Sequence, residues 1–573
     1  MKRRGLHNQP LRREWQALAT SVAALESHSG SEQFTPADQS RAFPLLLVSA
    51  LTFFALAIDG YHPYAEDGGL YLAGVLRLLD PSLYPHATAF VLEPMRHSLF
   101  APTVAAAVRL THLSLPIVLL ALHLASIWAT LFAAWMLAAR CWPSRRARAG
   151  AVVLLACWLA LPVAGTALLF MDPYATARSL STPAMVLALV GALDSTALGA
   201  PQRRLRGLLL CAAGLVLAAA MHPLMAAYAL GATLMLLCAR APKRTVRLYA
   251  TAALAAAALA CATVLQSLAP PESAAYLRVA LTRTYWFPAQ WRWYELLGLA
   301  APLAIVTIFA FRKQRQPTPG APSIPRSLRN GWELASQYMC RIGEQTNDAH
   351  RALARMAIAL GATSCLIAVL FTRPAAPTHL IARLQPLRAF QIVYLVLILA
   401  LGATLGERLL RRIPWRWAAA ILLLGGIMFT AQRSAFPNSN HLELPGIAPQ
   451  NHWSQAFLWA RDHTPKDALF ALDADYINAP GEDAQCFRAI AQRSALPDYS
   501  KDGGEASIAP ELTAEWVRGQ AAQQSLSAPA TTDAQRLSTL HSLGVSWVML
   551  QSSATTRFDC PYSNSAVKVC RLP

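Results

Sequence analysis

Long apolar stretches recur along this chain, and they limit its fold more than any single motif does. Most of them approach the ~20 residues that a helix needs to cross a lipid bilayer. Of the 573 residues, 55% are hydrophobic and only 14% are charged, which disfavours a soluble fold. The sequence therefore predicts an α-helical polytopic membrane protein with about eleven transmembrane helices. The apolar windows are 43–58, 114–139, 150–170, 180–193, 205–221, 223–239, 248–268, 296–311, 354–371, 387–406 and 417–430.

The positions of arginine and lysine support this count and give the chain an orientation. Basic residues collect in short loops on the cytoplasmic side of a membrane. If the N-terminus is cytoplasmic, every second loop is basic, and an odd number of crossings places the C-terminal tail outside. The net charge of +19 then reports topology, so we expect no binding of nucleic acid. The basic loops contain Arg140, Arg145, Arg146 and Arg148; Arg203, Arg204 and Arg206; Arg240, Lys243, Arg244 and Arg247; Arg312, Lys313 and Arg315; and Arg408, Arg411, Arg412 and Arg416.

The composition divides the chain into a polar start, a membrane domain and a soluble tail. Residues 1–42 are polar and begin with basic residues, so we expect a flexible cytosolic extension. Residues 43–433 form the membrane domain, with an acidic first outer loop at 59–97 and a Pro-rich inner loop at 313–353. Residues 98–112 predict an amphipathic helix at the interface. Where 205–221 meets 223–239, either two short spans surround a tight outer turn or one broken element re-enters.

Residues 434–573 predict a small α/β domain outside the membrane. The stretch WSQAFLWARDHTPKDALFALDA predicts a helix, a turn and a strand, while GVSWVMLQ and AVKVCRL predict further strands. The helix before the first of these lies in TDAQRLSTLHSLG. A length of about 130 residues can bury its own core. Cys560 and Cys570 either join in a disulfide or stay as free thiols, and both alternatives remain open.

The motif IDGYHPYAEDGGLY follows the first apolar window and gathers Asp59, Glu66 and Asp67 beside Gly68 and Gly69. Three carboxylates next to a membrane either bind a divalent cation, Mg²⁺ or Mn²⁺, or supply a general base. The glycines would let the backbone approach a ligand or turn sharply into a helix. The plainer alternative is an acid at the end of a span followed by acids that favour a helix N-terminus.

Outer arginines add a second group of candidate site residues, because the topology rule does not explain them. A guanidinium binds phosphate through paired hydrogen bonds, so the group predicts a pocket for a lipid-linked phosphate or pyrophosphate. The plainer alternatives are headgroup contacts, snorkelling side chains and a capped helix start with an internal ion pair. The candidates are Arg178 in MDPYATARSLSTP, Arg283 and Arg292 in an aromatic-rich loop, Arg383 and Arg388 before a span, and His222 in a turn.

An inner N-terminus, an acidic motif after the first span, an amphipathic helix in the first outer loop and a soluble outer domain together resemble the GT-C superfamily of integral-membrane glycosyltransferases. The resemblance covers residues 43–573 in architecture, and in motif it depends on Asp59 and the Glu66–Asp67 pair. WARDHTPKDALF also looks like the start of outer domains in bacterial members. The resemblance implies a polyprenyl-phosphate or polyprenyl-pyrophosphate sugar as donor. Transfer to a glycan, lipid or protein would occur at the outer, periplasmic face of the cell inner membrane.

The same resemblance implies roles for individual residues. Asp59 or Asp67 would be the catalytic base, Glu66 would contact a metal or the acceptor, and the region of Arg388 would contact the lipid phosphate. The tail lacks the WWDYG-type motif expected of oligosaccharyltransferases, which argues against that branch of the superfamily and leaves the acceptor open. Two other functions remain alternatives, namely a transporter or flippase for a lipid-linked intermediate and a non-catalytic scaffold with a partner-binding outer domain. Convergence of the acids and outer arginines on one cavity would favour the enzyme over the scaffold.

Overall fold

The structure is a computed structural model that describes residues 42–197, 201–311 and 329–573, with side chains described from residue 348 onward in the last range. The expected N-terminal extension therefore lies outside the described residues, apart from Ala42. Much of the expected Pro-rich inner loop lies outside them too. Its second half is helical, because α14 (Arg329–Phe371) begins well before the apolar window at 354–371.

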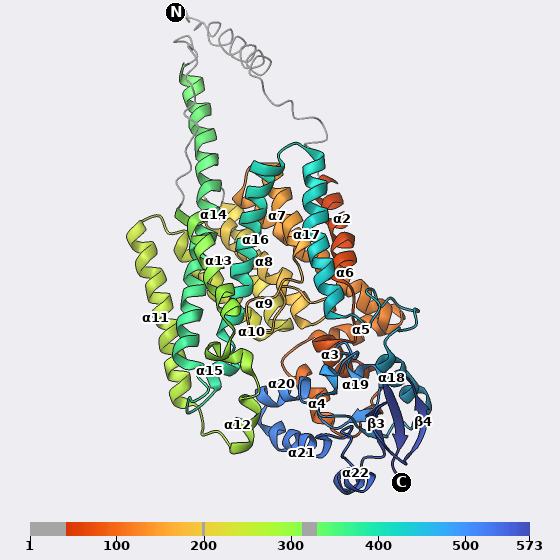
Figure 1. The fold of residues 1–573 in the computed structure, drawn as a ribbon. Coiled ribbons are helices and arrows are strands. Elements are labelled where there is room, and N and C mark those ends of the chain that lie inside the picture. Colours follow the sequence, from red (N-terminus) through yellow and green to blue (C-terminus); the bar gives the residue numbers. More distant parts are fainter. Residues whose placement is uncertain (1–41, 198–200, 312–328) are drawn as a thin grey trace, which may run out of the picture.

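A layer of roughly parallel helices forms the larger part of the molecule, and the C-terminal domain covers one end of it (Figure 1). Among the described residues, eight helices are long and apolar enough to cross a membrane. The chain is thus a mostly helical, multi-pass membrane protein with a small sheet domain. These spans are α2 (Ala42–Asp59), α6 (Leu115–Cys141), α9 (Pro201–Met221), α11 (Arg244–Leu268), α13 (Trp293–Phe311), the Asp348–Phe371 part of α14, the segment Leu380–Leu410 containing α16 (Phe390–Thr404), and α17 (Pro414–Ala435).

Three further helices occupy the remaining apolar windows but are shorter or less apolar. They are α7 (Arg145–Cys157), α8 (Ala177–Ser195) and α10 (Pro223–Ala239). Every apolar window therefore contains a helix, while the count of about eleven crossings stays a prediction. The turn at His222 separates α9 from α10, and the choice between two short spans around a tight outer turn and one broken element that re-enters stays a prediction.

The expected span at 150–170 is wrong in its second half. Helix α7 ends at Cys157, and the chain from 158 to 176 is irregular. Its backbone groups pair locally, since the Val163 N–H donates to the Leu168 carbonyl at 2.8 Å and the Phe170 N–H to the Leu161 carbonyl at 2.8 Å. An apolar composition predicted a helix here because it does not distinguish a lipid-facing span from irregular backbone buried in protein.

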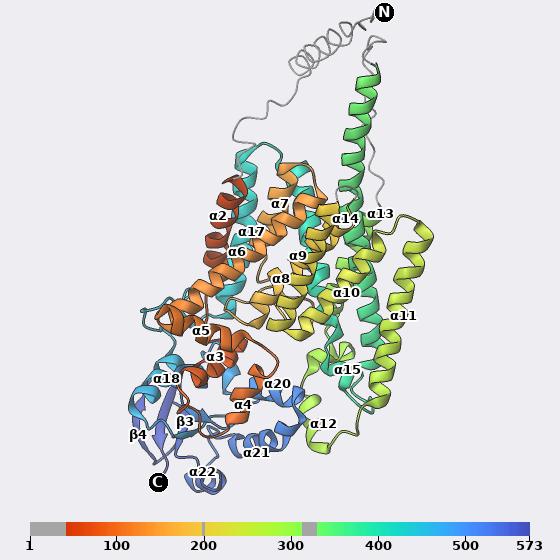
Figure 2. The same ribbon diagram turned by 180° about the vertical axis from the view of Figure 1, so that it is seen from behind.

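Where the structure describes them, the predicted inner loops lie at the end of the helical layer opposite the C-terminal domain (Figures 1 and 2). Asp194 at the end of α8 accepts from Arg140 at 2.7 Å and from Arg203 at 3.0 Å. Arg240 after α10 pairs with Asp348 at 3.0 Å. Basic residues from successive inner loops therefore lie on one side, as the orientation requires. Which side faces the cytoplasm stays a prediction.

The first outer loop folds onto the C-terminal domain. It contains α3 (Glu66–Leu79), α4 (Thr88–Leu92), η2 (Glu93–Met95) and α5 (Phe100–Thr111), and α3 lies next to α19 (Phe487–Ala491) of the tail (Figure 1). Leu72 and Phe100 from this loop share one hydrophobic core with Phe457 and Phe487 from the tail. The predicted helix at 98–112 is confirmed as α5, and its buried face belongs to this core.

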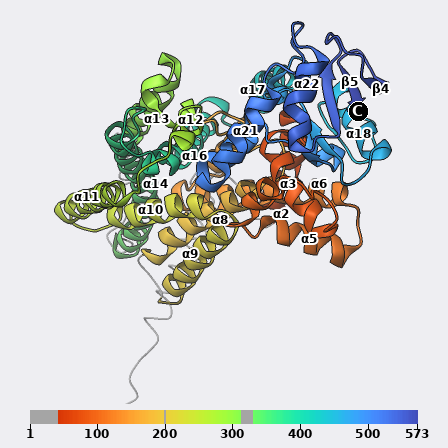
Figure 3. The same ribbon diagram turned by 90° about the horizontal axis from the view of Figure 1, so that it is seen from below.

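The C-terminal domain is built on a five-stranded mixed sheet in the order β2-β1-β3-β5-β4. The sequence predicted β1 (Leu469–Ala471), β3 (Trp547–Gln551) and β5 (Val567–Arg571), together with α18 (His452–His463) and α22 (Asp533–Leu540). It missed β2 (Ser494–Ala495) and β4 (Asp559–Ser563), which are very short or alternate weakly. Also present are α19 (Phe487–Ala491), α20 (Lys501–Ile508) and α21 (Thr513–Gln523). Figure 3 shows α11 at the edge of the helical layer farthest from β4 and β5.

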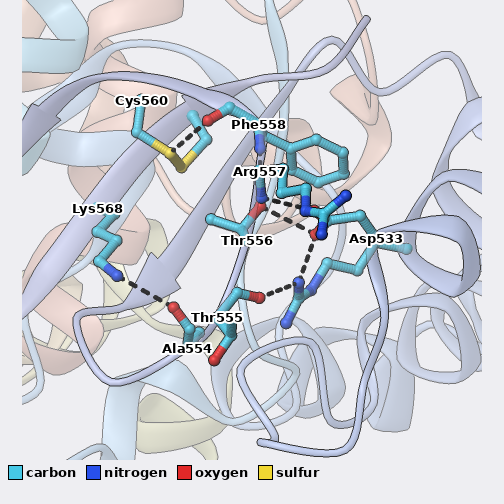
Figure 4. Close-up of a disulfide and its surroundings, with 10 residues drawn as sticks. Asp533, Ala554, Thr555, Thr556, Arg557, Phe558, Cys560 and Lys568 are labelled. Carbon is cyan, nitrogen blue, oxygen red and sulfur yellow. Dashed lines mark hydrogen bonds and ion pairs between the residues drawn. A yellow bond between two sulfur atoms is a disulfide. The ribbon is translucent and has the colours of Figure 1, made fainter.

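A disulfide joins Cys560 on β4 to Cys570 on β5, which settles the alternative between a bridge and free thiols. The chain before β4 is also tied to α22 (Figure 4). Asp533 accepts from the Thr556 hydroxyl at 2.9 Å and from the Arg557 N–H at 2.7 Å. The edge of the sheet is therefore fixed both covalently and by hydrogen bonds.

Candidate functional site

A cavity of about 1480 Å³ lies where the membrane helices meet the C-terminal domain. One part of its wall is apolar and comes from the irregular segment and α17, including Trp158, Leu161, Ile427 and Met428. The rest is charged. A cavity with one apolar side and one charged side suits a ligand that combines a hydrophobic chain with a polar head. The charged lining residues are Glu66, Asp67, Glu93, Asp172, Arg178, Arg283, Arg383, Arg388, Lys501 and Glu505, with His97 and His222 beside them.

The two acids of α3 border this cavity, and both are ion-paired. Asp67 accepts from Arg178 at 2.9 Å through one oxygen and from Lys501 at 3.0 Å through the other. Glu66 pairs with Lys501 as well, and Arg178 also pairs with Asp172 at 2.8 Å. Burial opposes the ionisation of Asp67, but the positive charges of Lys501 and Arg178 hold its pKa well below the ordinary range. Asp67 is therefore a charged carboxylate with both oxygens occupied.

The C-terminal domain fixes the start of α3. Glu66 has a φ of +51°, a left-handed conformation that costs a non-glycine residue about 1–3 kcal/mol when surrounding structure imposes it. Its N–H donates to the Ala484 carbonyl at 2.8 Å, and the Cys486 N–H donates to the Tyr64 carbonyl at 2.9 Å. The acidic motif thus takes its conformation from residues of the tail.

The adjacent glycines serve packing between the two domains rather than approach to a ligand. A Cβ on Gly69 would lie 2.3 Å from the Cys486 Cβ and 2.4 Å from the Tyr64 carbonyl oxygen. A Cβ on Gly68 would lie 2.9 Å from the Tyr174 ring. The expectation of a sharp turn with open ligand access is therefore wrong in its second part, because tail and loop residues fill that space.

Asp59 lies apart from the other two acids. It is the last residue of α2, is only 4% exposed and does not border the cavity. No cluster of three or more His, Cys, Asp or Glu side chains able to hold a metal ion occurs among the described residues. The described structure does not bring Asp59, Glu66 and Asp67 together as such a cluster, because Asp59 ends a separate helix and Lys501 and Arg178 already pair with the other two carboxylates. The Mg²⁺ or Mn²⁺ site stays a prediction.

The outer arginines divide into those that border the cavity and one that does not. Arg292 is exposed, donates to the Tyr294 hydroxyl at 3.1 Å and lies outside the cavity, contrary to its predicted place in the phosphate pocket. The aromatic side chain two residues later holds it at the surface. Arg283 borders the cavity but donates to the Ser500 and Tyr499 carbonyls at 2.7 and 2.8 Å, which fastens it to the tail.

The remaining basic candidates face the cavity more freely. Arg383 donates to the Ile508 carbonyl at 3.1 Å. The guanidinium of Arg388 makes no hydrogen bond or ion pair with any residue in the described ranges, and its Nε is buried. It lies 5.8 Å from the centre of the Tyr285 ring. His222 also borders the cavity, with a buried Nδ1 that has no hydrogen-bond partner in the described part of the chain.

Helix α20 contributes residues that the sequence analysis missed. Lys501, Gly504, Glu505 and Ile508 all border the cavity, at the i, i+3, i+4, i+7 spacing of one helical face. The opposite face is buried. This spacing within KDGGEASI was the signal that could have identified the helix, but two glycines made the stretch resemble a loop.

No protein family matches the sequence, and neither does any curated protein. Among solved structures, the chain is similar to the archaeal oligosaccharyltransferase AglB from Archaeoglobus fulgidus in complex with an inhibitory peptide and a dolichol-phosphate. The sequence identity is 13% and the TM-score 0.40, and the match covers 89% of this chain and 70% of that chain. The chain is also similar to a crystal structure of the Archaeoglobus fulgidus oligosaccharyltransferase tethered with an acceptor peptide. There the sequence identity is 12% and the TM-score 0.43, and the match covers 89% of this chain and 69% of that chain. No residue role is transferred from these structures.

Proposed function

We propose that this protein is a membrane glycosyltransferase that moves a sugar from a polyprenyl-phosphate or polyprenyl-pyrophosphate donor to an acceptor. The reaction would take place in the cavity beneath the C-terminal domain, on the outer face of the membrane. One observation supports the proposal most directly: the Arg388 guanidinium borders the cavity without a hydrogen bond or ion pair among the described residues. Arg388 is partly exposed, its buried Nε has no hydrogen-bond partner among the described residues, and its planar donors fit a phosphate group.

The form of the cavity supports a donor with a long apolar chain. The irregular segment and α17 provide an apolar surface through residues such as Leu161, Leu168, Ile427 and Met428. Arg388 and Arg383 lie at the charged part of the same cavity. In this arrangement the polyprenyl chain contacts the apolar wall and the arginines stabilise the departing phosphate, while the acceptor attacks the anomeric carbon from the opposite side.

The gathering of predicted residues favours an enzyme over a scaffold. Seven of the candidate residues border one cavity instead of being dispersed over the surface: Glu66, Asp67, Arg178, His222, Arg283, Arg383 and Arg388. Of the two acids that the sequence proposed as base, only Asp67 is among them. Because both of its oxygens are ion-paired, we assign Asp67 to holding Lys501 and Arg178 in position.

An arginine pair tests the function. Arg388→Gln removes the unpaired cavity guanidinium, whereas Arg292→Gln removes an exposed arginine outside the cavity. We expect Arg388→Gln to slow the consumption of polyprenyl-phosphate sugar by about 100-fold or more, as loss of a charge-stabilising group in a transition state does. Binding of undecaprenyl phosphate to the protein in nanodiscs should weaken in parallel, with both variants folded. Equal activity of the two variants would contradict the proposal.

A further inference from the structure

The cavity contains one carboxylate whose surroundings differ from those of the others. Five acids border it, and four of them have a cationic partner. Glu66 and Asp67 pair with Lys501, Asp67 and Asp172 with Arg178, and Glu93 with Arg96. The carboxylate of Glu505 makes no hydrogen bond or ion pair with any residue that the structure describes. It is the acid best placed to accept a proton from a ligand.

The geometry of α20 explains why Glu505 is unpaired. Lys501 lies four residues earlier on the same helical face, which is the usual position of an intrahelical partner. Its ammonium instead reaches across to Glu66 and to Asp67, at 3.0 Å from the latter. The ion pairs that connect α20 to α3 therefore use the cation that would otherwise neutralise Glu505.

The space beside Glu505 is open to a ligand. A Cβ placed on the neighbouring Gly504 would meet no atom within 4 Å. On the other face of the helix, Asp502 is fully buried and pairs with Arg488 at 2.6 Å, and a Cβ on Gly503 would lie 2.7 Å from the Arg283 side chain. Contacts on this buried face hold α20 so that Gly504 and Glu505 face the cavity.

The charges around Glu505 give its carboxyl a different protonation behaviour from that of Asp67. Burial raises its pKa first, and the negative charges of Asp67 on α3, Glu93 on η2 and Asp502 on its own helix add to this effect, while Lys501 opposes it. Together they raise the pKa of Glu505 to about 8. A general base is most effective when its pKa lies near the operating pH.

We propose that Glu505 is the general base of the transfer and accepts the proton of an acceptor hydroxyl in this cavity. The assignment depends on the proposed glycosyltransferase function. In the step, the acceptor O–H bond breaks and its proton goes to a Glu505 oxygen. The acceptor oxygen forms a bond to the anomeric carbon of the sugar. The bond between that carbon and the phosphate oxygen breaks, and its electron pair leaves with the polyprenyl phosphate or pyrophosphate. Glu505 then releases the proton to solvent.

The first test compares glutamates inside and outside the cavity. Glu505→Gln keeps the size of the side chain but cannot accept a proton. We expect it to slow consumption of labelled polyprenyl-phosphate sugar by about 100-fold or more, since a positioned general base contributes 10²–10⁴-fold. Binding of undecaprenyl phosphate by the full chain in nanodiscs should stay within about threefold, because a base for the acceptor does not hold the phosphate. The matched control is Glu515→Gln on α21, which lies outside the cavity lining.

A conservative variant separates proton transfer from a structural role. Glu505→Asp keeps the carboxylate, so we expect partial activity that rises with pH, whereas Glu505→Gln should lose the pH dependence together with most of the activity. Wild-type consumption of the donor with full activity in Glu505→Gln would overturn the role of Glu505 and leave the proposed function intact. Absence of donor consumption by the wild-type protein would overturn both.

A chemical probe reports on Glu505 without turnover. Dicyclohexylcarbodiimide modifies protonated carboxyl groups in apolar surroundings. We expect mass spectrometry of the full chain to find Glu505 modified near pH 7, with less modification above about pH 8, where the group ionises. The ion-paired Asp67 should stay unmodified under both conditions. Failure to modify Glu505 near pH 7 would contradict an open, protonatable carboxyl and overturn the assignment.

Discussion

Helices α3 and α20 border the same cavity and begin with almost the same residues, Glu-Asp-Gly-Gly at 66–69 and Lys-Asp-Gly-Gly at 501–504. In α3 the aspartate, Asp67, borders the cavity. In α20 the aspartate, Asp502, turns away and pairs with the buried Arg488. The cavity-facing positions of α3 are the first, second, fifth and sixth, whereas those of α20 are the first, fourth, fifth and eighth. The two helices thus differ by a rotation of about one residue, or about 100°.

The glycines of the two helices pack differently. In α3 the second glycine, Gly69, packs tightly against Cys486, while in α20 the first glycine, Gly503, packs against Arg283 and Trp516. The second glycine of α20, Gly504, is left open beside Glu505. Both glycines of α3 are therefore closely packed, since a Cβ on Gly68 would lie 2.9 Å from the Tyr174 ring, whereas in α20 only Gly503 is. Similar helix starts thus present different acids to the cavity.

Breaking the ion pairs at α3 should cause the largest loss of folding stability. Arg178→Met leaves Asp67 and Asp172 without the cation that lies between them, and Arg178 is only 7% exposed. We expect a loss of about 3–5 kcal/mol in the free energy of unfolding, as for other buried pairs that lose one partner. Thermal unfolding of the protein in nanodiscs measures it. Arg383→Met, which removes one hydrogen bond to a carbonyl, should cost about 1 kcal/mol. Similar losses of stability in the two variants would contradict the conclusion that the ion pairs of Arg178 with Asp67 and Asp172 stabilise the fold.

Replacing a glycine by alanine should change folding stability by an intermediate amount, with a loss in α3 and a gain in α20. Gly69→Ala forces a Cβ into the space of Cys486 and the Tyr64 carbonyl, and we expect a loss of about 1–3 kcal/mol. Gly504→Ala meets no atom and improves helix propensity, so we expect a gain of up to about 1 kcal/mol. The same unfolding experiment measures both. A loss of stability in Gly504→Ala would show that this side of α20 is packed.

A further contrast between α3 and α20 is how their acids make the stability of the protein depend on pH. Because the pKa of Glu505 is raised to about 8, the folded state keeps a proton that the unfolded chain releases above about pH 4. Stability should therefore fall as the pH rises from about 4 to 8 and level off above 8. Glu505→Gln should make this fall smaller.

The contribution of Asp67 to folding stability changes with pH in the opposite direction. Its lowered pKa gives a contribution to stability that is present above about pH 4 and is lost as the pH falls further. Asp67→Asn should remove that acid-side loss. Because the negative charge of Asp67 helps to raise the pKa of Glu505, it should also make the fall in stability between about pH 4 and 8 smaller. Unfolding temperatures of both variants and the wild type across this pH range test the contrast. An unchanged alkaline slope in Glu505→Gln would place the responsible proton on another group.

The positions of the apolar helices were largely predictable from the sequence. Backbone groups in a bilayer must be satisfied within the segment, so every long apolar window contains a helix. The strands β1, β3 and β5 followed from alternation and β-branched residues. The irregular segment at 158–176 was not predictable, because it is as apolar as a span. The position of Arg292 outside the cavity was not predictable either, since a loop sequence does not show which side chains a neighbouring ring holds at the surface.

The sequence by itself determined that this is a multi-pass membrane protein with a small α/β tail, and it identified Asp67 and Arg388 as residues of interest. Those properties depend on local hydropathy and on the chemistry of each side chain. Only the tertiary structure decided which acids are paired and which is free. Lys501 contacts Asp67 across 434 residues of chain, and that contact leaves Glu505 without a partner. The state of a carboxylate depends on the charges and solvent around it, and packing between distant segments supplies both.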